Sequence, residues 1–164
     1  MKSTTSRFER APTAAVALSA AWLAGALWAS SAGAADHVDA SKLIHQYYAA
    51  ATKYSATGKG ADRLKGFLAD DVSVDAPGMA TLVGKDKYLT ALHQPNASEN
   101  LHADSITRDG DTIRVKLLDH FTARNTGPFM GRQVVKGEKW TQRYDLTYTL
   151  KGGKIAHVLV QPAK

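Results

Sequence analysis

One carboxylate stands on the apolar face of a predicted strand. From residue 113 to 123 the sequence alternates with a period of two, and Asp119 shares its face with Val115, Leu117 and Phe121. A charged carboxylate on such a face is costly to bury unless it is paired or protonated. Either Asp119 lies in a cleft, where a raised pKa would suit acid–base chemistry, or a bulge turns its side chain outward.

A second candidate acid, Asp145, belongs to the polar face of the long predicted strand over 134–150. In one interpretation it faces solvent and pairs with Arg143 or Lys139. In the other, this polar face lines a cleft, and the opposite face packs against a partner subunit. The aromatic members of that opposite face are Trp140, Tyr144 and Tyr148.

An aromatic stripe marks the predicted helix over 42–55. Tyr47, Tyr48 and Tyr54 share one side of it with Ile44 and Ala51, which is the spacing of an amphipathic helix. The stripe can simply be core packing. A phenol in a cleft would need a hydrogen-bond partner, so one of these hydroxyls could instead point at a ligand.

Other chemistries find no support in the sequence. There is no Cys, which excludes disulfides and thiolate nucleophiles. The six His residues lack metal-type spacing, and no phosphate loop, nucleophile elbow or dinucleotide fingerprint is present. We therefore expect neither a metal nor a cofactor.

Residues 1–34 have the order of a secretory signal peptide. Lys2, Arg7 and Arg10 precede an uncharged run over 14–29, and Ala32-Gly33-Ala34 forms a small-residue cleavage pattern. The alternative is an uncleaved membrane anchor, although the apolar run is short for a bilayer span. We expect cleavage, a periplasmic or secreted protein, and no membrane attachment afterwards.

The remaining chain, 36–164, is the right length for a single domain. The formal net charge of the whole sequence is +6. The basic residues are scattered and form no dense stripe with interleaved aromatics, so the sequence gives little support for nucleic-acid binding.

The order of predicted elements indicates an α+β fold. A strongly twisted sheet on one long helix would leave a concave cleft, where small-molecule sites form. The predicted helices span 42–55, 62–68 and 85–93. The predicted strands span 72–75, 101–107, 113–123, 134–150 (with a bulge near 136–137) and 155–160.

This pattern resembles the nuclear transport factor 2-like superfamily, which includes SnoaL-like proteins and ketosteroid isomerase. The resemblance covers about 43–160. Its motifs are the segments 43–47, 68–77, 83–86 and 144–148, the last followed by a Gly-containing turn and Lys154-Ile155. It implies a cone-shaped, curved antiparallel sheet packed against three N-terminal helices, and a homodimer formed through the sheet.

The resemblance also implies roles for particular residues. Ketosteroid isomerase hydrogen-bonds an enolate with a helical Tyr and a protonated Asp, and moves the proton with another Asp. Tyr47 and Asp145 fall at the first two positions. At the third, Ala76 stands where the family has an acid before Pro77, and a one-residue gap would bring Asp75 into register.

Two hypotheses follow. In the first, the exported protein binds a small, largely apolar molecule in the cone, with any catalysis being cofactor-free, isomerase-like proton transfer. Tyr47 and Asp145 would then polarise a carbonyl, and Asp75 or Asp119 would carry the proton. In the second, it is a non-catalytic dimeric module that docks a protein partner through its sheet face.

Overall fold

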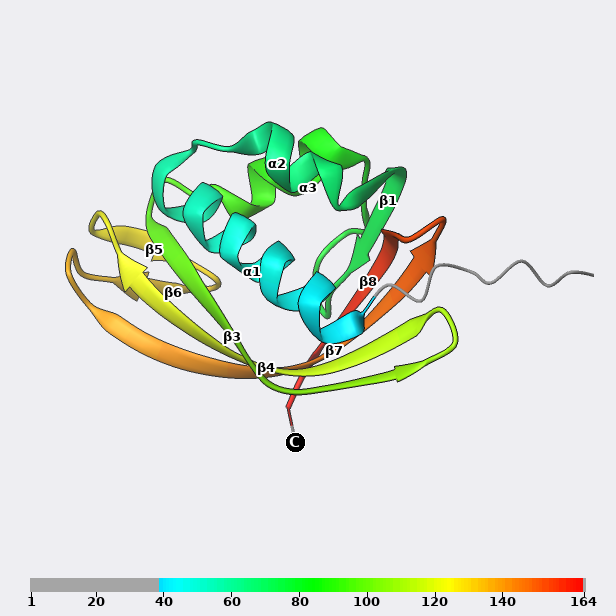
Figure 1. The fold of residues 1–164 in the computed structure, drawn as a ribbon. Helices are drawn as coiled ribbons and strands as arrows, with labels where there is room; N and C mark the ends of the chain where they lie inside the picture. The colour runs from blue at the N-terminus through cyan, green and yellow to red at the C-terminus, as the bar shows by residue number, and fades with distance from the viewer. Residues whose placement is uncertain (1–38, 164) are drawn as a thin grey trace, which may run out of the picture. The chain divides into compact units, whose positions relative to one another are not determined.

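A computed structural model describes residues 39–163, so the predicted signal peptide lies outside the described residues. This part of the chain contains three helices and eight strands (Figure 1). The helices are α1 (Ala40–Thr57), α2 (Ala61–Gly66) and α3 (Lys85–Leu92). The strands are β1 (Leu68–Asp75), β2 (Leu82–Val83), β3 (Ala97–Asp109), β4 (Thr112–Ala123), β5 (Gly127–Phe129), β6 (Arg132–Val134), β7 (Lys139–Lys151) and β8 (Lys154–Pro162).

Six strands form one curved sheet in the order β2-β1-β8-β7-β4-β3. All neighbours are antiparallel except β1 and β8, which run parallel. The sheet bends around α1, and α2 and α3 lie beyond that helix (Figure 1). The predicted α+β class is confirmed, although the parallel pair makes the sheet mixed rather than purely antiparallel.

Three further details differ from the sequence prediction. Strand β3 begins four residues earlier than expected, at Ala97. The long strand predicted over 134–150 is divided, because β6 ends at Val134 and β7 starts at Lys139. The three residues before that break pair with β5 in a separate hairpin. Gly137, with φ +85°, lies in the break and takes a conformation that suits glycine.

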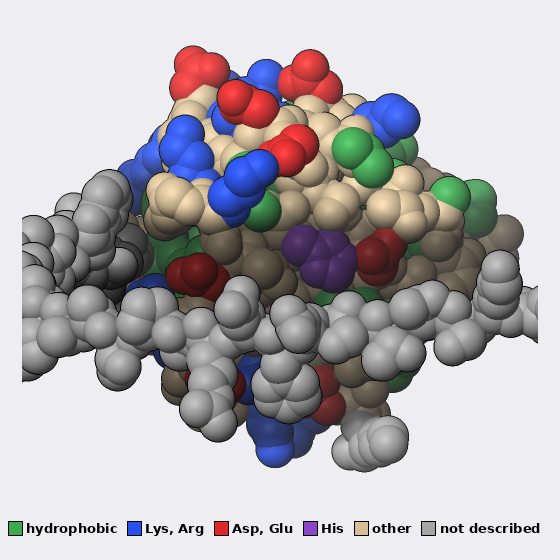
Figure 2. Space-filling model, turned by 90° about the vertical axis from the view of Figure 1, so that its right-hand side faces the viewer, with side chains coloured by type: hydrophobic (Ala, Val, Ile, Leu, Met, Phe, Trp, Pro, Cys, Tyr) green, Lys and Arg blue, Asp and Glu red, His purple; other side chains and the backbone are tan. Residues whose placement is uncertain are grey.

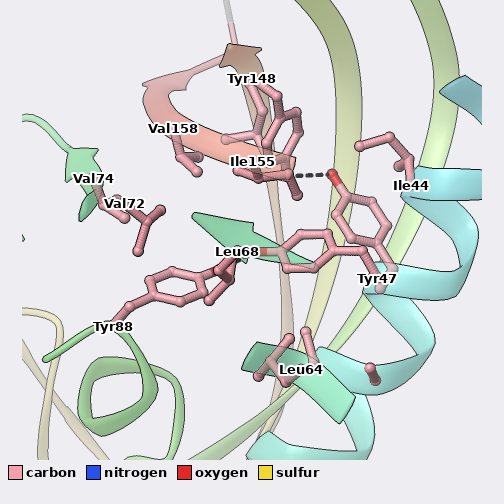
Figure 3. Packing of buried hydrophobic residues seen from close by; sticks show 14 of the residues in the cluster. Ile44, Tyr47, Leu64, Leu68, Val72, Val74, Tyr88, Tyr148, Ile155 and Val158 are labelled. Atoms are coloured by element: carbon pink, nitrogen blue, oxygen red, sulfur yellow. Dashed lines mark hydrogen bonds between the residues drawn. The ribbon is translucent and has the colours of Figure 1, made fainter. Parts of the chain in front are cut away.

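The inner face of the sheet is defined by strict alternation. Odd-numbered residues of β4 from Ile113 to Ala123 are all buried, and those from Ile113 to Phe121 pair with even-numbered residues of β7. Tyr47 on α1 and Tyr88 on α3 point toward one another within this core (Figure 3). Tyr48 on α1 is hydrogen-bonded to Tyr148 on β7, with 2.9 Å between their hydroxyl oxygens.

Helix α1 is fastened to the edge of the sheet by two hydroxyls. The backbone N–H of Glu99 donates to Ser55 Oγ, and that of Leu101 donates to Thr52 Oγ1, both at 3.0 Å. Strand β3 is at the sheet edge, so without the helix these amides would lack partners. The two bonds hold this stretch of β3 against α1.

The surface over α2 and α3 carries mixed charges (Figure 2). Ion pairs join Lys65 to Asp86 and Lys85 to Asp70, at 2.7 and 2.6 Å. Such exposed pairs contribute little to stability. Within residues 39–163, no helix is long and apolar enough to span a membrane.

We predict that Ser55→Ala destabilises the protein by about 1–3 kcal/mol, because it leaves the partly buried amide of Glu99 without its acceptor. Ser55 is fully buried, so water cannot easily replace the hydroxyl. Urea denaturation of the parent and variant measures the change. Ser41→Ala, at an exposed position of the same helix, is the control. A loss below about 0.5 kcal/mol would show that this contact does not hold the helix to the sheet.

Candidate functional site

A cavity of about 500 Å³ lies between the helices and the inner face of the sheet. Strands β4, β7 and β8 contribute apolar side chains such as Leu117, Leu146 and Val160. Met79 and Met130 line it as well and are more than half exposed, so they lie at its mouth. The volume falls in the range typical of small-molecule sites.

Asp119 is a polar group in this apolar wall. Its side chain lies on the inner face of β4, between Leu101 of β3 and Gln142 of β7. It is only 3% exposed, and its Oδ1 atom has no hydrogen-bond partner among the described residues. Of the two alternatives that the sequence left open, the structure therefore selects the cleft.

Glu99 supplies a second carboxyl on the same wall. It faces Phe121 in the β3–β4 register and is thus the diagonal neighbour of Asp119, a relation that places Cβ atoms roughly 7–8 Å apart. Both side chains line the cavity. Burial raises the pKa of both carboxyls, and the charge of Glu99 raises that of Asp119 further. The pair therefore tends to retain a proton that isolated carboxyls would lose.

Tyrosine hydroxyls complete the polar part of the site. The hydroxyls of Tyr47 and Tyr88 are hydrogen-bonded to each other, and the Tyr144 hydroxyl donates to Gln142 Oε1. Burial raises the pKa of all three tyrosines above the ordinary value, so these phenols remain neutral at physiological pH. Tyr47 lines the cavity, as the resemblance implied, and its hydroxyl is bonded to that of Tyr88.

Asp75 is held outside the cavity. Its carboxylate accepts hydrogen bonds from Thr81 Oγ1 at 2.5 Å and from His157 Nε2 at 2.8 Å. These bonds hold the pKa of Asp75 below its ordinary value. Its chain neighbours Val74 and Ala76 line the cavity, and Asp75 does not. The structure therefore does not bring Asp75 together with Tyr47 and Asp119.

The interpretation in which the polar face carrying Asp145 lines the cleft is wrong. Asp145 pairs with Lys116 and Gln161, both on the outer face of the sheet. The even-numbered residues of β7 face the cavity instead. The pairing of β4 with β7 is unbroken from Thr112–Thr149 to Thr122–Lys139, so the alternation keeps the odd-numbered residues of β7 on the outer face.

The aromatic face of β7 is correspondingly internal, so it cannot dock a partner as the sequence suggested. Tyr148 is 2% exposed, and Tyr144 lines the cavity. Trp140 stacks on Phe121, with 5.1 Å between ring centroids, and Arg132 covers its ring at 5.0 Å. No observation in the described residues supports a docking module built on this face.

Sequence analysis missed Glu99 and Tyr88 as site residues. Glu99 precedes the predicted strand. The alternation of that strand nevertheless extends backward through Leu101 and Glu99 to Ala97, and this pattern could have indicated the earlier start. Tyr88 belongs to the predicted helix over 85–93, and its contact with Tyr47 spans 41 positions in the chain, so no local pattern indicates it. Among residues 39–163, no group of three or more His, Asp or Glu side chains could hold a metal ion.

Comparisons with solved structures agree on the fold. The chain is similar to a candidate polyketide cyclase from Xanthomonas campestris pv. campestris, with TM-score 0.61 and 20% identity over 74% of this chain and 87% of that one. A candidate polyketide cyclase from Pseudomonas putida KT2440 gives TM-score 0.62 and 19% identity over 76% and 91%. An LEH-like epoxide hydrolase from Mycobacterium tuberculosis gives TM-score 0.57 and 13% identity over 74% of this chain and 80% of that one.

An NTF2-like protein from Anabaena variabilis also matches, with TM-score 0.55 and 16% identity over 76% of this chain and 90% of that one. The chain therefore has the nuclear transport factor 2-like fold, as its sequence pattern predicted. No protein-family model and no curated protein matches the sequence. Because this fold hosts many activities, function must be argued from the cavity itself.

We predict that Asp119→Asn changes how stability depends on pH. With the pKa of Asp119 raised by folding, the folded protein holds more protons than the unfolded chain above about pH 4, so stability falls as the pH rises. An Asn side chain is neutral throughout. The variant should therefore be more stable than the parent by at least about 1 kcal/mol at pH 8, with little difference at pH 4.

Urea denaturation from pH 4 to pH 8 measures this difference. Asp145→Asn is the matched control, because its carboxyl lies on the outer face of the same sheet. Parallel pH profiles for the parent and Asp119→Asn would show that Asp119 is ionised at no cost in the folded protein.

Proposed function

We propose that this chain binds a small, largely apolar molecule inside the cone, and that its buried carboxyl pair can exchange a proton with that molecule. One observation supports the proposal above all. Asp119 Oδ1 is a buried polar atom without a protein partner, and it belongs to a side chain that lines the cavity. A bound ligand would supply the missing partner.

The surroundings favour such a ligand. The walls around Asp119 are mostly aliphatic and aromatic, which suits an apolar body. Proteins of similar structure include two candidate polyketide cyclases and an LEH-like epoxide hydrolase, all of which are named for small-molecule chemistry. These likenesses support a small-molecule site and leave the reaction open.

The proton chemistry rests on the carboxyl pair and the tyrosines. A protonated Asp119 can donate to a ligand oxygen, while Glu99 beside it can accept or return the proton. The paired hydroxyls of Tyr47 and Tyr88 add a neutral donor that can stabilise a developing oxyanion. This arrangement resembles the isomerase scheme, with Asp119 in place of Asp145 and without Asp75.

We further propose that the protein is exported after removal of residues 1–34 and that two copies associate through the sheet. The small-residue pattern at Ala32-Gly33-Ala34 supports export. Because the aromatic side chains face the cavity, the outer face is the surface that a second copy would contact. Leu118 and Leu159 lie half-buried on this otherwise polar face.

Native mass spectrometry of the protein from its own cell envelope tests these points together. We expect a chain that starts at Ala35, a dimer, and a small molecule that dissociates on denaturation. A full-length mass would contradict export, and a monomer would contradict association. A ligand that is highly charged and lacks an apolar body would contradict the proposed binding.

We predict that Val160→Trp weakens binding of the released molecule by about tenfold or more. Val160 lines the cavity, so the indole would fill the space that the ligand needs. Gln161→Trp is the matched control, because Gln161 is exposed and pairs with Asp145 on the outer face. Equal affinities for the two variants, measured by calorimetry, would place the ligand outside the cavity.

A further inference from the structure

The cavity has an unbalanced arrangement of charge. Glu99 and Asp119 are its two acidic lining residues, and both lie on the β3–β4 wall. Arg143 is the one basic residue that borders it, and its side chain is exposed at an odd-numbered position of β7, on the outer face. No described cation therefore faces the two carboxyls from inside the cavity.

We propose that the cavity takes a protonated amine that carries an apolar body. This inference rests on the proposed function and names the class of its ligand. An ammonium group would donate hydrogen bonds to Asp119 Oδ1, the buried oxygen that has no partner. It would also balance the negative charge that two neighbouring carboxyls carry once they ionise.

Aromatic rings around the carboxyls suit a cation. Tyr47, Tyr88, Tyr144 and Phe121 all line the cavity, and their ring faces attract a positive charge. Their hydroxyls, where present, are already engaged with each other or with Gln142. The carboxyl oxygens are the strongest acceptors in the cavity for a cationic donor, and Asp119 Oδ1 has no partner, so the ammonium would bind there and the apolar body would extend toward Met79 and Met130 at the mouth.

Binding of an ammonium ion must be coupled to loss of a proton. The carboxyl pair holds a proton in the empty cavity because burial disfavours the charged form of both carboxyls, and the charge of Glu99 raises the pKa of Asp119 further. A bound cation removes that cost, so the shared proton leaves to solvent as the amine enters already protonated. Charge is conserved: one positive charge enters the cavity and one leaves it.

Other groups facing the carboxyls do not titrate in the relevant range. Helices α1 and α3 present the phenols of Tyr47 and Tyr88, and β7 presents those of Tyr144 and Tyr148. Burial raises the pKa of each of these phenols. The side chains that β1 and β8 present are apolar. Proton release on binding would therefore report on the carboxyl pair.

Three probes with one hydrocarbon body test the proposal: 2-naphthylmethylamine, 2-naphthylmethanol and 2-naphthoic acid. Calorimetry with the full chain at pH 7, in buffers of different ionisation enthalpy, gives affinity and proton exchange together. We expect the amine to bind at least about tenfold tighter than the alcohol, with proton release. The carboxylate should bind most weakly, because it adds a third acid to the wall.

Variants assign the effect to the pair. Asp119→Asn and Glu99→Gln should each lower the affinity for the amine by about tenfold and reduce proton release, because the pKa of the remaining carboxyl is still raised by burial, while affinity for the alcohol changes less than about threefold. Asp145→Asn should change neither. Retained amine affinity in both Asp119→Asn and Glu99→Gln would overturn the proposal.

Failure of this inference is distinguishable from failure of the proposed function. If the alcohol binds as tightly as the amine, and Val160→Trp blocks both, the cavity is an apolar site without charge preference and only the amine proposal falls. If none of the three probes binds and the envelope-purified protein releases no small molecule, both proposals fall.

Discussion

Burial of the Asp119 carboxyl without a partner for Oδ1 is the constraint around which this molecule is arranged. A carboxyl in an apolar wall is tolerated when it is protonated or when something outside the chain binds to it. Here the backbone N–H of Asn100 gives the charged form only partial support, and Glu99 opposes it. The resulting free-energy cost of ionising Asp119 is typical of a site that exchanges a proton or binds a ligand.

The fold keeps this site open by dividing its hydrophobic core. One cluster joins α1, α3 and the sheet around Tyr47 and Tyr148, and a second gathers Phe121 and Phe129 beneath the β5–β6 hairpin. Asp119 lies between them on β4, two residues before Phe121. Helix α1 docks on the edge strand through Ser55 and Thr52, which sets how closely it approaches the inner face. The cavity lies between the helices and the inner face of the sheet, and members of both clusters line it.

Local patterns in the sequence predicted the elements well, because helix α1 and strand β4 have clear periods of 3.6 and 2. Asp119 was identifiable for the same reason, because it is a charged residue at a position where the alternation predicts an apolar one. The parallel pairing of β1 with β8 was not predictable in this way, because it joins segments about 80 residues apart and leaves no local signal.

Asp145 shows where such reasoning fails. Its candidate role depended on which face of β7 lines the cleft, and the alternation separates the two faces without telling which one the helices cover. Glu99 was missed for a different reason. The predicted strand began four residues too late, so Glu99 was assigned to a loop. Tertiary contacts determine where a strand begins and which of its faces is buried. The residues of the cavity wall depend on both, so they are the part of the site that is hardest to predict from the sequence.

Titration of the Asp119 carboxyl by carbon-13 NMR in the folded full chain tests the central claim most directly. The carboxyl should titrate well above the ordinary range, and Glu99→Gln should lower its pKa, because the neighbouring negative charge is gone. A carboxyl that titrates near pH 4 and does not respond to Glu99→Gln would contradict the claim, since it would show an exposed, independent acid rather than a buried pair.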